Sequence, residues 1–120
     1  MGDNYGRAAL EQLANITQQS TVVEAANTFT CDLSQRKNFT ITINDTNPKT
    51  IAFTNIPADM DFAIPVTIKV ICSAAAVINT HPAGTVWQWG TAPVLTSGKT
   101  YYFSFIRAGA GWHASYVGEW

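Results

Sequence analysis

The feature that most constrains the fold is a pair of alternating segments near the C-terminus. Residues 101–107 read YYFSFIR and residues 112–117 read WHASYV, and aromatic or apolar side chains recur at every second position of each segment. A period of two is the spacing that a β-strand imposes on its side chains. The two segments therefore predict a β-hairpin around Gly109-Ala110, with glycine at the first loop position, as a type II′ turn requires.

This loop sets the pairing of the two strands. Phe105 lies opposite Ala114 and Phe103 opposite Tyr116, so the larger apolar side chains of both strands share one face. A slip by one residue would set the aromatic face of one strand against the polar face of the other, so the pattern favours this register. A hairpin alone is marginally stable in water, and the rest of the chain must therefore supply strands that cover its apolar side.

The residues before the hairpin predict further short strands with Thr-rich outer faces. The alternation recurs over residues 28–33, 38–43, 50–54, 66–72 and 85–89. Residues 34–37 are expected to form the turn between the first two of these strands, and residues 74–78 to pair near the strand at 66–72. Strands that recur at intervals of roughly ten residues, with no helix between them, predict an all-β domain over residues 25–120, an antiparallel β-sandwich of jelly-roll type.

Residues 6–19 (GRAALEQLANITQQ) predict a short N-terminal helix, because Ala9, Leu13 and Ile16 recur at spacings of four and three. A helix of about three turns is too short to be stable alone in water. Its apolar stripe packs either on the domain of its own chain or on copies of itself about a symmetry axis, as in the seam of a coiled coil. We therefore assign residues 1–24 to an N-terminal helical and oligomerisation segment.

Composition narrows the possible functions. Charged residues make up 12% of the chain and the net charge is −1, against roughly 25% charged residues in ordinary soluble domains. The longest basic run is Arg36-Lys37, so we expect no nucleic-acid partner. No apolar stretch approaches the ~20 residues of a membrane span, so we expect no membrane insertion.

Residue types that carry catalysis or metal binding do not gather in a motif. The two histidines, His81 and His113, stand without an H-x-H, H-E-x-x-H or C-x-x-C pattern. Asp59 and Asp61 have the spacing of half a Ca²⁺ site, which recurs by chance in loops. The chain is therefore expected not to be an enzyme and to hold no metal and no cofactor.

The two cysteines, Cys31 and Cys72, both lie in strand-like stretches. Buried free thiols are the expected state, because cysteine behaves as a small apolar residue in a core. A disulfide between strands is the alternative.

Aromatic side chains are the remaining candidates for a binding site. Trp87 and Trp89 project to one side of their predicted strand, an arrangement found both in sugar-binding proteins and in the cores of small sandwiches. Trp120, at the C-terminus, is expected to dock on another surface. If the chain binds a sugar, Trp89 and Tyr102 are the candidate ligand-binding residues.

The order of short motifs in the C-terminal third is also informative. A Trp-containing strand, a Gly and Pro turn, a Leu-Thr pair, a Gly-Lys turn, an aromatic strand and a closing Trp-x-Ala segment follow one another at residues 87–90, 92–93, 95–96, 98–99, 101–105 and 112–114. Upstream, NFTITI, KTIAFTNIP and PVTIKVI come in a similar order. Over roughly residues 28–117 the chain thus resembles the distal domains of tail fibres and receptor-binding proteins of tailed bacteriophages.

The resemblance implies a non-enzymatic phage protein that is assembled in the bacterial cytoplasm and resides in the virion. Its implied function is that of a tail-fibre-like adhesion module that recognises a host cell-surface saccharide or protein, and its implied state is a homotrimer. Tail fibres carry a long shaft or attachment domain before this module, whereas only a short segment precedes it here. The alternatives are a small capsid decoration or head-fibre structural protein that contacts other virion proteins, a fragment of a longer fibre, and a free-standing carbohydrate-binding module.

The second face of the predicted hairpin is polar only in its middle. Ser104 lies opposite Ser115, while Tyr102, Ile106 and Val117 surround this pair with apolar surface. A monomer seldom exposes such a patch outside an interaction site. The predicted interface of a homotrimer comprises this patch, the helical stripe and the terminal tryptophan, namely Ala9, Leu13, Ile16, Tyr102, Ile106, Val117 and Trp120. The alternative is that the N-terminal segment of the same chain folds over this face.

Overall fold

The computed structural model describes residues 19–34, 36–58 and 65–118, which form nine β-strands and one 3-10 helix. In chain order these are β1 (Gln19–Val22), β2 (Thr28–Asp32), β3 (Asn38–Ile43), β4 (Lys49–Thr54), β5 (Val66–Cys72), β6 (Ile78–Thr80), β7 (Thr85–Trp87), η1 (Gln88–Gly90), β8 (Thr100–Ala108) and β9 (Gly111–Gly118). The predicted helix lies outside the described residues, except for Gln19, which begins β1. β1 itself falls within the segment that the sequence assigns to the N-terminus.

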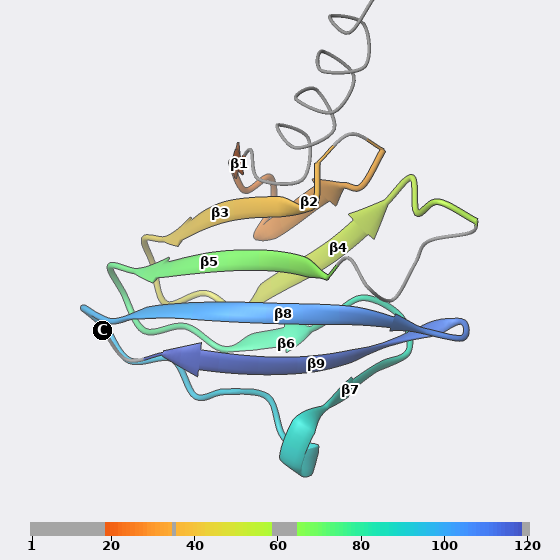
Figure 1. The fold of residues 1–120 in the computed structure, drawn as a ribbon. Helices are drawn as coiled ribbons and strands as arrows, with labels where there is room; N and C mark the ends of the chain where they lie inside the picture. The colour runs from red at the N-terminus through yellow and green to blue at the C-terminus, as the bar shows by residue number, and fades with distance from the viewer. Residues whose placement is uncertain (1–18, 35, 59–64, 119–120) are drawn as a thin grey trace, which may run out of the picture.

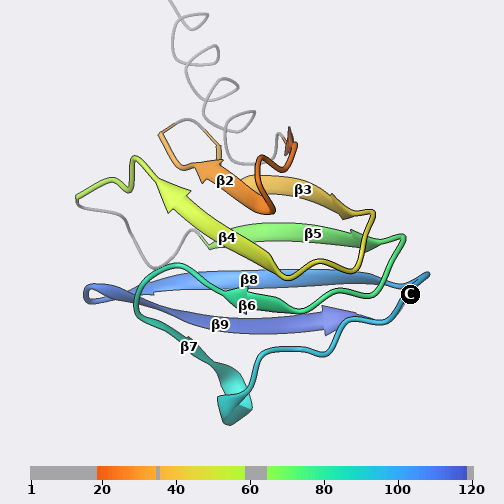
Figure 2. The ribbon, with the colours of Figure 1, turned by 180° about the vertical axis from the view of Figure 1, so that it is seen from behind.

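The strands form two sheets with the core between them (Figures 1 and 2). The larger sheet has the order β1-β3-β5-β8-β9-β7, and the smaller has the order β2-β4-β6. The described part of the chain is therefore almost all β, as predicted from the alternation.

Most of the strand pairs are parallel, which corrects the prediction of an antiparallel jelly roll. The pairs β1-β3, β3-β5, β2-β4, β4-β6 and β7-β9 are parallel, and among the described strands β5-β8 and β8-β9 are the antiparallel pairs. The physical reason is that the chain crosses to the opposite sheet after each of its first strands. When the chain comes back to a sheet, the new strand runs parallel to the previous strand of that sheet. Strands β1 to β6 thus form three successive turns of a coil, each with one strand in the large sheet and one in the small sheet.

Two of the predicted connections change accordingly. Residues 34–37 link these two strands, as predicted, but they carry the chain from β2 in the small sheet to β3 in the large one. Residues 74–78 do not pair with β5; Ile78, the last of them, begins β6, which pairs with β4. Alternation within a segment predicts that it is a strand, but it does not determine the partner of that strand.

The core lies between the sheets and receives one face of each strand. Its buried side chains are Phe29, Cys31, Leu33, Phe39, Ile41, Ile43, Ile51, Val66, Ile68, Val70, Cys72, Ala76, Ile78, Trp87, Leu95, Tyr101, Phe103, Phe105, Trp112 and Ala114. Phe53 of the small sheet meets Phe105 and Trp112 of the large sheet edge to face, with ring centroids 5.1 and 4.9 Å apart. Burying a large apolar side chain contributes roughly 1.5–3 kcal/mol, so these contacts join the two sheets.

The C-terminal hairpin has the predicted register. Phe105 pairs with Ala114 and Phe103 with Tyr116. Gly109 has a φ of 61°, in the left-handed region that the first loop position of a type II′ turn requires. The prediction from the hairpin sequence is thus confirmed at the level of individual residue pairs.

Candidate functional site

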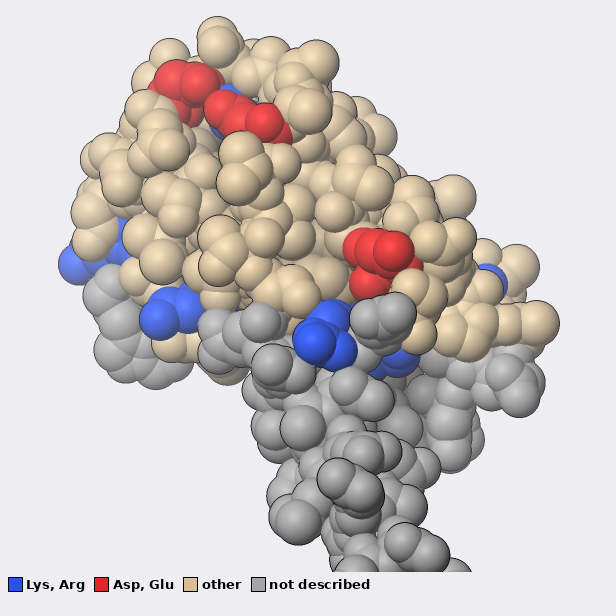
Figure 3. All heavy atoms as spheres, turned by 90° about the horizontal axis from the view of Figure 1, so that it is seen from above, with Lys and Arg blue, Asp and Glu red and all other residues tan. Residues whose placement is uncertain are grey.

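The outer face of the six-stranded sheet carries hydrogen-bonding side chains in transverse rows. One row crosses four strands as Asn38, Thr67, Ser104 and Ser115. The next row crosses the same strands as Thr40, Lys69, Tyr102 and Val117. Hydroxyl, amide and phenol groups thus dominate both rows, and Lys69 supplies their one charge. Figure 3, which views the molecule from above, shows the acidic and basic side chains in separate groups on an otherwise uncharged surface.

An apolar patch lies on the hairpin end of this face, and we call it the hairpin patch: Tyr102, Ile106, Val117 and Val86. These four side chains are 36%, 40%, 59% and 59% exposed, respectively. Tyr102 pairs with Val117 across the hairpin, while Ile106 and Val86 lie on either side of His113. The structure therefore exposes the three hairpin residues of the predicted interface. Its other members, Ala9, Leu13, Ile16 and Trp120, lie outside the described residues.

A hollow of about 330 Å³ opens beside the hairpin patch where β7 ends. β7 pairs with β9 only over Thr85–Trp87, and the chain then turns into η1, so that β9 runs on past its neighbour. The hollow is lined by Trp87, Gln88, Ile106, His113, Ala114 and Ser115. Its size is at the lower end of the range of small-molecule sites. The indole, imidazole, amide and hydroxyl groups around it can form hydrogen bonds with a polar ligand.

The two predicted ligand-binding residues do not share one described site. Trp89 lies in η1, so the prediction that Trp87 and Trp89 project to one side of a strand is wrong, because the strand ends at Trp87. Trp87 is 8% exposed, and the centroid of its ring is 5.3 Å from that of Phe103, which confirms its place in the core. The side chain of Trp89 lies outside the described part of the chain. Tyr102 is on the outer face of β8, with β9 between it and β7.

Two buried nitrogen atoms beside this hollow have no hydrogen-bond partner among the described residues, namely Trp87 Nε1 and His81 Nδ1. The two rings meet edge to face with their centroids 5.2 Å apart. Burial lowers the pKa of His81 below its ordinary value of 6.5, because desolvation penalises the charged imidazolium. The imidazole is therefore neutral at pH 7.

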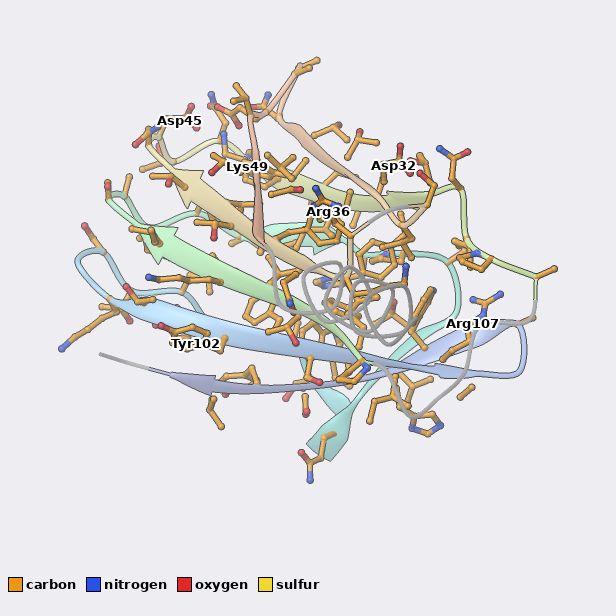
Figure 4. The ribbon with its side chains drawn as sticks, turned by 45° about the horizontal axis from the view of Figure 1, so that its top comes forward. Asp32, Arg36, Asp45, Lys49, Tyr102 and Arg107 are labelled. Atoms are coloured by element: carbon orange, nitrogen blue, oxygen red, sulfur yellow. The ribbon has the colours of Figure 1, made fainter. Side chains whose placement is uncertain are left out.

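A second hollow, of about 370 Å³, lies among β1, β2, β3 and the link between β2 and β3. It is lined by Ser20, Val22, Thr30, Asp32, Ser34, Arg36 and Phe39, and Figure 4 shows Asp32 and Arg36 near β2. The backbone N–H of Ser34 donates to Asp32 Oδ1 at 2.9 Å, and this bond is the largest of the effects that lower the pKa of Asp32. The hollow thus holds a fixed acceptor beside several hydroxyl groups.

A cluster around Lys49 was not predicted from the sequence. Lys49 is the one charged side chain that is fully buried among the described residues. Its Nζ donates to Glu24 Oε2 at 2.7 Å, to Asp45 Oδ1 at 2.7 Å and to Asn27 Oδ1 at 3.0 Å. Figure 4 shows Lys49 and Asp45 close together at one end of the molecule. Burial by itself lowers the pKa of this ammonium group, but the hydrogen bonds to the two carboxylates more than offset that effect, and the net shift is upward.

The cysteines are buried free thiols, as expected, and not a disulfide. Burial raises the pKa of Cys31 to about 12 and also raises the pKa of Cys72. Within the described ranges, His, Cys, Asp and Glu do not form a group of three that could hold a metal ion, and Asp59 and Asp61 lie outside those ranges. None of the described helices has the length and apolar character needed to cross a membrane.

Comparison with known proteins identifies no relative: the chain matches no protein-family model, no curated protein and no solved structure. Its function must therefore be inferred from its own residues and from the surfaces described above.

Proposed function

We propose that the chain is a non-enzymatic bacteriophage virion protein, a tail-fibre-like adhesion module that recognises a host cell-surface saccharide or protein. The observation that carries this proposal is the outer face of the large sheet, where rows of hydroxyl and amide groups adjoin an exposed tyrosine ring and a hollow. Saccharides are recognised by hydrogen bonds to their hydroxyl groups together with contact between an aromatic ring and the apolar face of the sugar. The order of the C-terminal motifs supports the same function.

In this proposal three copies associate through the hairpin patch and through the apolar stripe of the N-terminal segment. Tyr102, Ile106 and Val117 come from the described surface, and Ala9, Leu13, Ile16 and Trp120 complete the proposed interface. Exposed apolar residues on a chain with so little charge favour association, because burial removes them from water. Cyclic closure keeps the assembly finite. The trimer is assembled in the bacterial cytoplasm and resides in the virion.

A capsid decoration or head-fibre structural protein is the second candidate, and a separate surface favours it. Val77 and Val94 are 67% and 85% exposed, and they flank an apolar hollow of about 300 Å³. The hollow is lined by Thr46, Ala75, Ala76, Val77, Ile78, Ala92, Pro93, Val94 and Leu95. Such a surface suits contact with other virion proteins better than contact with a sugar. A free-standing carbohydrate-binding module is the third candidate.

The test combines a glycan array with binding of the purified chain to intact cells of a panel of bacterial strains. The adhesion proposal predicts binding to at least one glycan or strain, and it predicts that Gln88→Ala, in the hollow beside η1 and outside the hairpin patch, weakens that binding at least tenfold. Val94→Ala, on the other surface, serves as the matched control and should leave binding unchanged. Absence of binding to glycans and cells, together with stoichiometric attachment to phage capsids, would instead establish the decoration role.

A further inference from the structure

The contacts of Lys49 bring together the three groups that a transamidation reaction requires. Nζ is 3.0 Å from the side-chain oxygen of Asn27 and 2.7 Å from a carboxylate oxygen of Glu24. An amine is a nucleophile, a carboxamide is an acyl donor, and a carboxylate moves protons between them. We propose that Lys49 and Asn27 form an intramolecular isopeptide bond, with Glu24 as the proton carrier and ammonia as the leaving group. This proposal is independent of the adhesion function.

The fold holds the acyl donor in place. Asn27 lies in a turn closed by two hydrogen bonds between Ala25 and Thr28, of 2.9 and 3.0 Å, and its own carbonyl accepts the N–H of Thr50 at 2.9 Å. Its φ of 64° is in the left-handed region, which non-glycine residues seldom adopt unless their surroundings impose it. The 3.0 Å contact between Nζ and Oδ1 keeps the amine beside the amide whose Cγ it attacks, and groups held together in this way react far faster than the same groups free in solution. The side chain of Lys49 is 0% exposed, so water does not compete for its amine.

The two carboxylates at Nζ have different surroundings and therefore different roles. Asp45 Oδ1 accepts from Lys49 and also from the backbone N–H of Asn47 at 2.9 Å, and these two bonds lower the pKa of Asp45. Asp45 thus stays ionised and fixes the amine in position. Glu24 is less exposed than Asp45, 28% against 44%, and Nζ is its one described hydrogen-bond donor. Glu24 is therefore better placed to receive a proton from Lys49.

The reaction balances without a cofactor. A proton first passes from the ammonium of Lys49 to Glu24, and the freed lone pair of Nζ attacks Cγ of Asn27, moving the C=O electron pair onto Oδ1. Glu24 protonates the amide nitrogen, the C=O bond re-forms, and the Cγ–Nδ2 bond breaks to release ammonia. Glu24 then takes the surplus proton from the new amide nitrogen and passes it to ammonia, which leaves as ammonium. One C–N bond has formed, one has broken, and the total charge is unchanged.

The resting state of this lysine is the ammonium ion, since the carboxylates hold it charged. Reaction therefore starts from the small population in which the proton has crossed the 2.7 Å bond to Glu24. Because ammonia leaves the protein, the step is irreversible, and one slow turnover per chain is sufficient. Glu24 and Asp45 are both partly exposed, so water can solvate their charges once the ammonium is gone. The product links the turn at Asn27 covalently to the start of β4.

Mass spectrometry of the purified full chain tests the proposal. The bond makes the intact chain lighter than its sequence mass by one ammonia. Trypsin does not cleave after an acylated lysine, so residues 38–69 should remain uncut and carry residues 8–36 as a branched peptide. An intact mass equal to the sequence mass, after allowance for removal of Met1, would overturn the proposal. A loss of ammonia that maps to a succinimide within a linear peptide would overturn it as well.

Variants then identify the role of each residue. Glu24→Gln keeps the shape of the side chain but cannot accept a proton, and Lys49→Arg keeps the charge but not the nucleophile, so both should have the full sequence mass. Asp32→Asn changes a carboxylate elsewhere in the structure and should leave the crosslink intact. Circular dichroism establishes that each variant is folded. A crosslink that persists in folded Glu24→Gln would contradict the assigned proton carrier, and one that persists in Lys49→Arg would contradict the assigned nucleophile.

Discussion

Gly84 and Gly111 approach each other so closely that neither position has room for a side chain. A Cβ on Gly84 would lie 2.7 Å from Cα of Gly111, and a Cβ on Gly111 would collide with the carbonyl oxygen of Gly84. That oxygen accepts a hydrogen bond from the N–H of Trp112 at 2.9 Å. The close contact of the two glycines therefore allows β7 to pair with β9. The hollow at the end of β7 depends on this junction.

Gly111→Ala should therefore destabilise the protein through overpacking, by about 1–3 kcal/mol. Gly111 does not have the positive φ of Gly84, so the effect would report crowding rather than backbone strain. Urea denaturation followed by tryptophan fluorescence measures the free energy of unfolding. Ala110→Ser, at an exposed position of the neighbouring turn, is the control and should change it little. An unchanged midpoint for Gly111→Ala would mean that β7 does not lie against β9 as described.

The half-buried imidazole of His81 should make stability depend on pH. Its pKa is lowered in the folded state by desolvation, so below about pH 6.5 the unfolded chain binds more protons than the folded chain. Stability is therefore fully present above pH 6.5 and falls as the pH drops toward the lowered folded pKa. Melting temperatures between pH 7.5 and 5 should decline in the wild type and decline less in His81→Gln. His113→Gln, at an exposed position, should follow the wild type, and equal slopes in all three proteins would refute the assignment to His81.

Neither cysteine should react with an aromatic disulfide reagent at pH 8 in the native state. Both thiols are buried, and the raised pKa values keep them protonated. In denaturant the same assay should titrate two thiols per chain. Rapid labelling of the native protein would contradict the described core, and two missing thiols in denaturant would mean that the pair is oxidised.

The hairpin could be predicted from the sequence because all of its determinants are local. The alternation of Tyr101, Phe103 and Phe105 defines the buried face, and Gly109 defines the turn, so the register follows from a short stretch of chain. The pairing of β2 with β4 could not be predicted in this way. Those strands are separated by β3 in the opposite sheet, and their parallel alignment depends on two crossings of the chain.

One feature of the sequence indicates that Lys49 is buried. Lys49 is in phase with Ile51 and Phe53, so an alternating strand that begins at residue 49 places a charged side chain on the face of the core. A lysine at such a position needs buried partners. Glu24 and Asn27 could not have been named in advance, because the crossing that brings them to β4 spans two sheets. By contrast, the exposure of Tyr102, Ile106 and Val117 follows directly from the hairpin register.

In the proposed assembly the hairpin patch is an interface between copies of this chain. Light scattering coupled to size-exclusion chromatography tests it most directly at micromolar concentration. The proposed assembly predicts three times the mass of one chain for the wild type and for Val94→Asp, a matched change at an exposed position outside the patch. It predicts the mass of one chain for Ile106→Asp, because an aspartate in the interface would be buried without a partner. A monomeric wild type, or a trimer that Ile106→Asp leaves intact, would contradict the claim.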